Sequence, residues 1–222
     1  QRCVNGGIPA VAQKGLRPGL RANGYFLPCK CIPSADMEIA PPRDADLYTT
    51  AIVHQKEMLA PDVCRLLLEP TTLLSYRAGQ FINLRRADGL ARSYSLASVP
   101  QEDGYLELHV KRMPGGVLSN WIFDTLQPGD ELEIQGPQGR SYYAVSSQSQ
   151  PLLLVATGTG LAPLLGIARD ALLEGHSGDI HLYHGSRHAH GLYLREPLLD
   201  LSARHPNFHY NGCLSGPQRP AC

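Results

Sequence analysis

The sequence predicts a multidomain chain in which a small antiparallel β-barrel is followed by an α/β domain with a parallel sheet. Two changes of pattern support this fold class. In the middle of the chain, apolar and polar residues alternate, which is typical of half-buried strands. After residue 150, a continuous apolar run ends in glycines and is followed by a helical stretch and a second apolar run. That order is typical of strand–helix–strand units, whose parallel sheet is expected to be buried on both faces.

The barrel segment is expected to contain several short strands. Period-two alternation covers 106–111 and 131–135, and a further strand is expected at 81–84, after the turn at Gly79. Several such runs separated by turn residues favour a closed antiparallel barrel. One helix is expected to interrupt it from about residue 117 to 126, because Pro128 and Gly129 follow as a stop signal.

The last segment is expected to alternate strands and helices. Strands are predicted at 152–156, 180–184 and 207–210, with helices from 161 to about 173 and from 192 to 203. This gives a sheet of about three strands, fewer than the roughly five or six of an open sheet. We therefore expect the C-terminal part of this domain to be missing. Joints rich in Pro, Asp and Ser at 41–46 and 146–150 separate the three segments.

The composition excludes several classes of protein. Of the 222 residues, 43% are hydrophobic and 18% are charged, as in ordinary globular proteins. Twenty basic residues balance twenty acidic ones, so nucleic acid is not an expected partner. The longest apolar runs are far shorter than the ~18 residues of a membrane span. Six scattered cysteines do not form a disulfide framework, which favours a cytoplasmic location. The first residue is Gln1, and no secretion signal follows it. We therefore expect this sequence to begin inside a longer protein.

A glycine-rich turn lies between an apolar strand and a helix. It consists of Gly158, Thr159, Gly160, Leu161, Ala162 and Pro163. Glycines allow the backbone to approach a pyrophosphate, and the free amides and dipole at the helix start favour negative charge. The third glycine of the usual dinucleotide pattern is absent, so a plain connecting turn is the alternative.

A second candidate is the strand Arg92, Ser93, Tyr94, Ser95. An arginine binds phosphate through paired hydrogen bonds, and a ring two residues away lies on the same face of a strand. A surface strand with an exposed arginine and a packed tyrosine is the alternative. A third candidate, Gly115 to Ser119, opens the expected helix and offers its first amides to a phosphate, with a simple helix start as the alternative.

Together the three motifs resemble the ferredoxin reductase family of flavoproteins, in the family's order and spacing, over residues 46 to 216. The resemblance implies that Arg92 neutralises FAD phosphates, that Tyr94 stacks on the isoalloxazine and that Ser95 bonds near the flavin N5. It implies a pyrophosphate site at Gly116 and Ser119, and a dinucleotide site at Gly158, Thr159 and Gly160. We also expect cofactor contacts from Ser93, His109, Lys111, Val117, Leu118, Leu161, Pro163, Ser186 and Arg187.

The first segment resembles the C-terminal end of a plant-type [2Fe-2S] ferredoxin domain. The similarity covers Gly24 to Pro33 and Asp36 to Ile39. Such domains bind the cluster with a Cys-x4-Cys-x2-Cys loop and one distant cysteine, and Cys29 matches the distant ligand. The other three ligands would precede residue 1. Cys3 and Cys31 then take packing positions; a Cys-x-Cys zinc site is the rival, although no second pair completes four ligands.

Nicotinamide specificity is predicted from two places. No acidic residue follows Gly185, Ser186 and Arg187 to bind the ribose 2′-hydroxyl of NADH. By the usual dinucleotide rule, this leaves room for the 2′-phosphate of NADPH. However, Ser215 is followed by glycine where NADP-dependent relatives of plant type have a Ser-Arg pair, which favours NADH. The histidines at 181, 184, 188 and 190 are expected to be ordinary strand and loop residues.

The expected domains are a ferredoxin remnant at 1–41, an FAD-binding barrel at 46–145 and an incomplete NAD(P)-binding domain at 150–222. The expected function is an NAD(P)H-dependent oxidoreductase that passes electrons through FAD to a [2Fe-2S] cluster and on to an oxygenase or similar acceptor. The alternatives are a relay or regulatory subunit without turnover of its own, and a reductase of the ferric or flavohaemoglobin type. We expect this chain alone to bind FAD but to turn over slowly.

Overall fold

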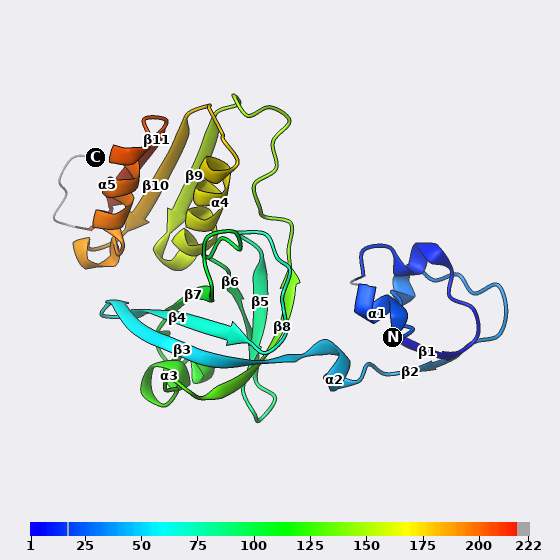
Figure 1. The fold of residues 1–222 in the computed structure, drawn as a ribbon. Coiled ribbons are helices and arrows are strands. Elements are labelled where there is room, and N and C mark those ends of the chain that lie inside the picture. Colours follow the sequence, from blue (N-terminus) through cyan, green and yellow to red (C-terminus); the bar gives the residue numbers. More distant parts are fainter. Residues whose placement is uncertain (17, 217–222) are drawn as a thin grey trace. The chain divides into compact units, whose positions relative to one another are not determined.

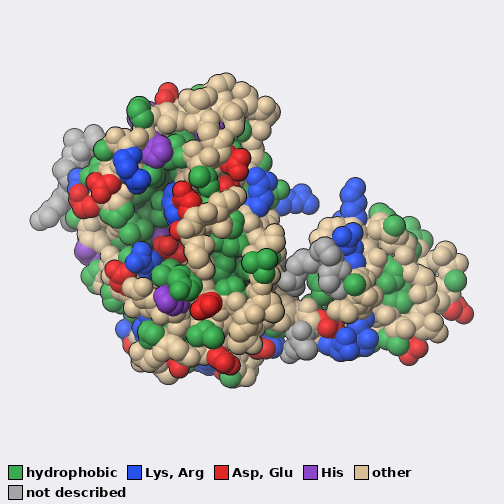
Figure 2. Space-filling view, viewed as in Figure 1, with side chains coloured by type: hydrophobic (Ala, Val, Ile, Leu, Met, Phe, Trp, Pro, Cys, Tyr) green, Lys and Arg blue, Asp and Glu red, His purple; other side chains and the backbone are tan. Residues whose placement is uncertain are grey.

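A computed structural model of the chain describes residues 1–16 and 18–216. The chain divides after residue 49 into two compact units, whose elements are labelled in Figure 1. No helix within the described residues is long and apolar enough to cross a membrane. On the visible face of the larger unit, basic and acidic side chains are interspersed, as the balanced composition leads one to expect (Figure 2).

The smaller unit is built around a two-stranded antiparallel sheet. Its elements are β1 (Arg2–Asn5), η1 (Ala10–Gln13), α1 (Pro18–Ala22), η2 (Pro28–Lys30), β2 (Glu38–Ala40) and α2 (Asp44–Leu47). Tyr25 lies in its small core, and its hydroxyl donates to Asp46 Oδ2 at 2.8 Å and accepts from the Arg43 amide at 2.9 Å. These bonds tie α2 to the rest of this unit. The expected joint at 41–46 therefore includes the first turn of a helix.

The larger unit begins with an antiparallel barrel, as predicted. Six strands lie in the order β6-β5-β8-β3-β4-β7. They are β3 (Thr49–Ala60), β4 (Val63–Pro70), β5 (Phe81–Arg85), β6 (Ala91–Ser95), β7 (Leu106–Lys111) and β8 (Glu131–Gln138). An antiparallel bridge between Leu96 and Leu108 joins the two outer strands, so the sheet curls towards closure.

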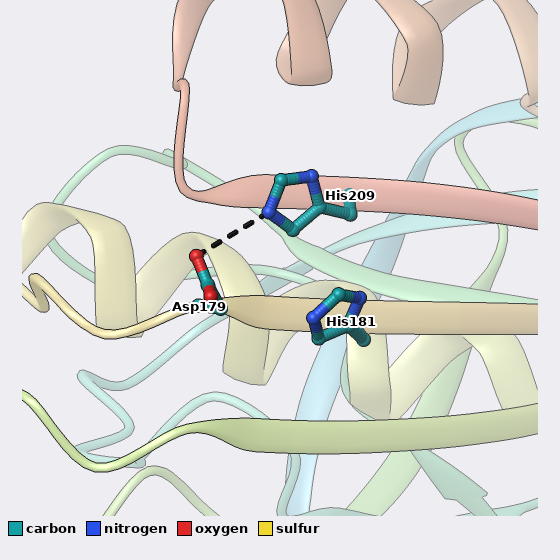
Figure 3. A group of neighbouring side chains, drawn as sticks. All are labelled: Asp179, His181 and His209. Carbon is teal, nitrogen blue, oxygen red and sulfur yellow. Dashed lines mark hydrogen bonds and ion pairs between the residues drawn. The ribbon is translucent and has the colours of Figure 1, made fainter.

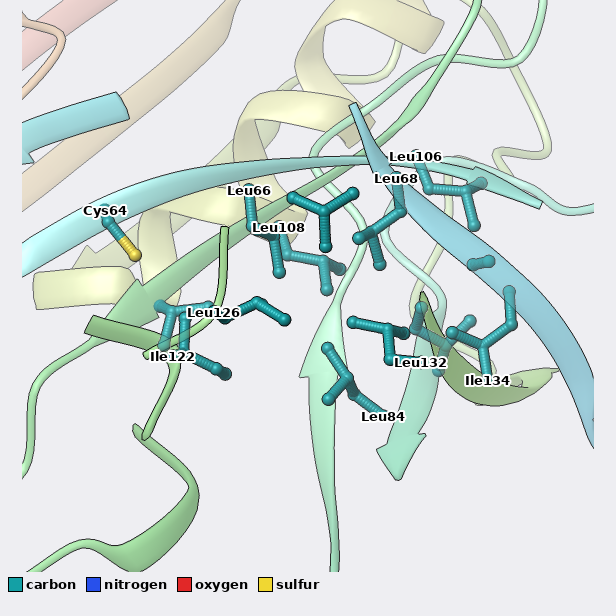
Figure 4. Close-up of a cluster of buried hydrophobic side chains, with 14 of the residues drawn as sticks. Cys64, Leu66, Leu68, Leu84, Leu106, Leu108, Ile122, Leu126, Leu132 and Ile134 are labelled. Carbon is teal, nitrogen blue, oxygen red and sulfur yellow. The ribbon is translucent and has the colours of Figure 1, made fainter. Parts of the chain in front are cut away.

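Alternate residues of the barrel strands fill its core. Leu66, Leu68 and Leu108 are completely buried (Figure 4). Helix α3 (Val117–Asp124) covers this core and contributes Ile122. At the end of α3, the Lys56 ammonium donates to the carbonyls of residues 122, 123 and 126 at 3.1, 3.1 and 2.5 Å. A cation at the helix C-terminus satisfies carbonyls that have no intrahelical partner, and it stabilises the end of α3.

The second part of the larger unit is an α/β domain with a parallel sheet, also as predicted. Within the described residues, the sheet has three strands in the order β11-β10-β9. The elements are β9 (Leu152–Thr157), η3 (Gly158–Gly160), α4 (Leu161–Leu173), β10 (Ile180–Ser186), η4 (Ala189–Gly191), α5 (Arg195–Arg204) and β11 (Phe208–Leu214).

The sequence predicts that this sheet is buried on both faces. For the described residues that prediction is wrong, because helices cover only one face. Ile180, Leu182 and Phe208 pack under α4 and α5, whereas Leu153 and Val155 on the other face are 69% and 64% exposed. Successive right-handed crossovers that advance in one direction place their helices on the same face (Figure 1).

Two predicted boundaries also differ. Helix α5 begins at Arg195 rather than at residue 192, because Leu194 has a left-handed backbone with φ of 58°. Strand β11 continues to Leu214, since its pairing with β10 persists for seven residues, well beyond the predicted end at 210.

Helix α4 packs directly on the barrel. A Cβ at Gly166 would lie 3.0 Å from the Ala97 carbonyl oxygen, so any larger residue would require this backbone to shift by a few tenths of an ångström. Beside it, Arg169 forms ion pairs with Glu102 at 2.9 Å and with Asp103 at 2.8 Å. The close packing fixes the glycine turn at the start of α4 next to strands β6 and β7 of the barrel.

Candidate functional site

A cavity of about 570 Å³ lies where the barrel meets the glycine turn. All three sequence motifs contribute to its walls: β6, the start of α3, and the turn before α4. Strand β7 completes the wall. The lining residues are Arg92, Ser93, Tyr94, Ser95, His109, Lys111, Met113, Gly115, Gly116, Val117, Leu118, Ser119, Thr159, Gly160, Ala162 and Pro163. We call this space the barrel cavity.

Arg92 and Tyr94 lie on the same face of β6, opposite Leu84 and Ile82 of β5. The Arg92 guanidinium is exposed, and its one hydrogen bond within the described residues goes to the neighbouring Ala91 carbonyl at 2.7 Å. No described carboxylate neutralises it. Its charge is therefore available to an anion in the cavity.

Tyr94 is half-buried against the barrel core. Burial raises the pKa of its phenol to about 12, so the ring is neutral at physiological pH. The two flanking serines differ. The Ser93 hydroxyl donates to Asn83 Oδ1 at 2.6 Å, whereas the Ser95 hydroxyl has no partner within the described residues. Of the two hydroxyls, the one at Ser95 is therefore free to bond a ligand.

The start of α3 forms a second part of the wall. The Ser119 hydroxyl accepts from the Met113 amide at 3.1 Å and donates to the Gly116 carbonyl at 3.3 Å. This side chain therefore holds the turn in shape. A Cβ at Gly116 would lie only 2.5 Å from Ser119 Oγ. The first amides of α3 have no intrahelical acceptor, and together with the helix dipole they favour an anion here.

His109 lines the barrel cavity but is only 4% exposed. Both of its ring nitrogens already have partners: Nε2 lies 2.8 Å from Glu107 Oε1, and Nδ1 lies 3.1 Å from the Tyr193 hydroxyl. A cofactor in this cavity would therefore pack against the imidazole ring of His109, because neither ring nitrogen is left to form a hydrogen bond with it.

A second cavity, of about 640 Å³, lies at the carboxyl ends of the three parallel strands. This is where open α/β sheets bind ligands. We call it the sheet cavity. It shares Thr159 and Lys111 with the barrel cavity, so the two are neighbours with a common wall. Its lining residues are Asp62, Val63, Lys111, Thr157, Gly158, Thr159, Gly185, Ser186, Arg187, His188, His190, Gly191, Cys213, Leu214 and Ser215.

The two cavities together contain all but one of the predicted cofactor-binding residues. Leu161 is the exception: it is completely buried in the core beneath α4 and lines neither cavity. As the first residue of α4, it anchors the helix whose preceding turn faces both cavities.

Several lining residues were not among the predicted ones. Met113 lines the barrel cavity, as does Ala162, which belongs to the predicted turn but was not expected to contact a cofactor. In the sheet cavity, Thr157 and Gly185 lie at strand ends, where the carboxyl-end rule could have found them. Asp62 comes from the turn between β3 and β4, and no local signal in the sequence connects it to this site.

The predicted metal ligand, Cys29, is exposed in η2 of the smaller unit. Within the described residues, one group of side chains could hold a metal ion: Asp179, His181 and His209. His209 Nε2 lies 3.4 Å from Asp179 Oδ1, and the two imidazole rings stack at 4.7 Å (Figure 3). This group lies at the beginning of β10 and β11, the opposite end of the sheet from the sheet cavity.

The four histidines considered from sequence do not form one cluster. His181 belongs to the group just described, and His184 is completely buried. His188 and His190 line the sheet cavity, with their rings stacked at 5.4 Å.

Two family models match the chain. The oxidoreductase FAD-binding domain matches residues 50–143, and the oxidoreductase NAD-binding domain matches residues 154–221. The first range contains the barrel motifs and the second begins within β9, just before the glycine turn.

Among curated proteins, the chain is 39% identical to the reductase subunit of an aromatic O-demethylase from Amycolatopsis sp., over 98% of this chain and 67% of the relative. It is 33% identical to the ferredoxin–NAD(P)+ reductase component of the naphthalene 1,2-dioxygenase/salicylate 5-hydroxylase systems of Ralstonia sp., over 92% and 64%. The chain spans between 54% and 67% of the length of such relatives.

Solved structures show the same fold. The Amycolatopsis cytochrome P450 reductase GcoB superposes with a TM-score of 0.75 at 35% identity, over 99% of this chain and 69% of that one. The ferredoxin reductase of carbazole 1,9a-dioxygenase gives 0.68 at 24% identity, over 96% and 66%, which indicates likeness of fold.

Proposed function

The chain belongs to the FAD- and NAD-binding oxidoreductases of the ferredoxin reductase type, and we propose that it passes electrons from NAD(P)H through FAD to a [2Fe-2S] centre. From there, electrons would go on to an oxygenase or a similar acceptor. One observation carries the proposal most directly. The barrel cavity and the sheet cavity share Thr159 and Lys111, so a flavin in one and a dinucleotide in the other would meet at a common wall.

The residues of the barrel cavity fit FAD. Arg92 supplies a cation with no carboxylate partner among the described residues, suited to paired bonds with a phosphate. Tyr94 supplies a neutral ring beside it, and the Ser95 hydroxyl is free to bond a ring atom of the ligand. The first turn of α3 supplies backbone amides for a second phosphate. Gly116 leaves these amides accessible because it has no side chain. FAD, when bound, would accept two electrons as hydride and release them singly.

The residues of the sheet cavity fit a dinucleotide. Gly158 has φ of 52° and begins the turn that exposes backbone amides at the carboxyl end of β9. Ser186 and Arg187 line the same cavity. Ser215, directly after β11, also lines this cavity. It is followed by glycine, where an arginine would bind the 2′-phosphate of NADPH. This absence supports NADH as the preferred donor.

The iron–sulfur centre is proposed from the resemblance of the first segment. Cys29 would be one of four ligands, and its exposed side chain fits that role. The proposed domains are 1–41 for the ferredoxin segment, 46–145 for the FAD barrel and 150–222 for the NAD domain. The matched family ranges lie within the last two. An oxygenase partner is supported by the names of the relatives, and a cytoplasmic location by the dispersed cysteines.

The proposed function is tested with the whole protein. The purified protein is expected to carry a yellow flavin chromophore, or to gain one on soaking with FAD, and NADH is expected to bleach it without air. NADPH is expected to bleach it more slowly at equal concentration. A protein that stays colourless after soaking would refute the flavin assignment, and a flavin that NADH leaves oxidised would refute the donor.

A further inference from the structure

A chain of polar side chains, two of them buried and one partly buried, crosses from the barrel to the nucleotide domain. Strand β7 contributes Glu107 and His109, and the segment between η4 and α5 contributes Tyr193. Glu107 Oε1 and His109 Nε2 are 2.8 Å apart, and His109 Nδ1 and the Tyr193 hydroxyl are 3.1 Å apart. The His109 side chain is completely buried and Tyr193 is 3% exposed.

For a neutral His109, the tautomer sets the direction of both hydrogen bonds. A carboxylate at Glu107 only accepts, so in that tautomer the ring proton is on Nε2. His109 Nδ1 is then an acceptor, and the Tyr193 hydroxyl must donate to it. Burial raises the pKa of Tyr193, which keeps this phenol protonated and able to donate.

The Tyr193 ring also contacts a second histidine. It meets His109 edge to face, with centroids 5.3 Å apart, and meets His184 in the same way at 5.4 Å. His184 is completely buried, and the Gly158 backbone lies close enough to interact with its ring. Burial lowers its pKa, so the ring is neutral and packs as an aromatic group. The next residue after Tyr193, Leu194, has the left-handed backbone that is unfavourable for a non-glycine residue.

This arrangement lies beneath the wall that the two cavities share. His109 lines the barrel cavity, and the residues that follow His184, Gly185 and Ser186, line the sheet cavity. We propose that Glu107, His109 and Tyr193 are positioning residues that set the nucleotide domain on the barrel at the separation needed for hydride transfer. The inference rests on the function proposed above. Hydride transfer needs reacting atoms about 3–3.5 Å apart, and a displacement of about 1 Å can cost ~100-fold in rate.

The chain offers a matched control for this assignment. The Tyr143 hydroxyl and His176 Nδ1 are also 3.1 Å apart, with their rings edge to face at 5.6 Å, and Tyr143 is 7% exposed. This second tyrosine–histidine pair is also little exposed to solvent, but neither residue lines a cavity. Removing its hydroxyl therefore has a similar effect on packing and none on the common wall.

The test compares variants of the whole flavoprotein by rapid-mixing measurement of flavin reduction at saturating NADH. Neither Tyr193 nor Glu107 lines a cavity, so Tyr193→Phe and Glu107→Ala leave the walls intact. Both are expected to lower the limiting rate about 10- to 100-fold, with the dissociation constant of NADH within threefold of wild type. Glu107→Gln, whose carbonyl still accepts from His109, is expected to stay within threefold, and Tyr143→Phe within twofold.

A second readout does not depend on the cofactor. In the apoprotein, amide hydrogen exchange at 106–111 and 189–194 is expected to quicken in Tyr193→Phe and Glu107→Ala but not in Tyr143→Phe. If Tyr193→Phe does not fold, Glu107→Ala decides the question. Wild-type rates in Tyr193→Phe or Glu107→Ala would overturn the inference, as would equal slowing in Tyr143→Phe. A wild-type protein that NADH cannot reduce would instead refute the proposed function.

Discussion

Replacing Arg92 with alanine tests the flavin site most directly. The exposed guanidinium has no carboxylate partner among the described residues, and its one hydrogen bond there is to the adjacent Ala91 carbonyl. Its removal is therefore expected to change the free energy of unfolding of the apoprotein by no more than about 0.5 kcal/mol. The substitution is instead expected to weaken the binding of FAD. A hydrogen bond to a charged group contributes about 1.5–3 kcal/mol. An arginine that binds a phosphate in bidentate fashion makes two such hydrogen bonds.

The loss of two such bonds amounts to about 3 kcal/mol or more, which is a rise of ~100-fold or more in the dissociation constant of FAD. The assay is calorimetric titration of FAD into the apoprotein. Arg187→Ala is the control, because Arg187 lines the sheet cavity and not the barrel cavity, and FAD affinity is expected to stay within threefold. Equal FAD retention in the two variants would show that Arg92 does not hold the phosphates.

Two further predictions concern local packing and thiol reactivity. Gly116→Ala places a Cβ 2.5 Å from Ser119 Oγ and is expected to lower the free energy of unfolding by about 1–3 kcal/mol, measured by thermal melting. Gly104→Ala, whose Cβ would meet nothing within 4 Å, is expected to melt like wild type, and equal losses in both would contradict the steric argument. Burial raises the pKa of Cys64 to about 11, so alkylation of the folded, cluster-free chain at pH 8 is expected to spare it and to modify the exposed Cys29, as mass spectrometry would show. Rapid labelling of Cys64 without unfolding would contradict its burial.

Local patterns determined the type and order of most elements of the larger unit. The alternation at 106–111 and 131–135 became β7 and β8, and the stop signal at Pro128 and Gly129 follows the end of α3. These predictions hold because side-chain periodicity and turn chemistry act over a few residues. The motif around Arg92 and the turn at Gly158 were recognisable for the same reason, since each is contiguous in the sequence.

Tertiary structure alone decided which of these pieces meet. Gly166 lets α4 press against the barrel, and that contact brings the turn at 158–160 to the strand at 92–95. The partners of His109 are a carboxylate on its own strand and a hydroxyl 84 residues away, and no spacing rule links it to Tyr193. Leu161 follows the glycines of the turn, yet it points into the core, because the face that a helix buries depends on what packs against it. The sequence by itself therefore determined the parts of the site, whereas their convergence depends on long-range packing that a local pattern cannot encode.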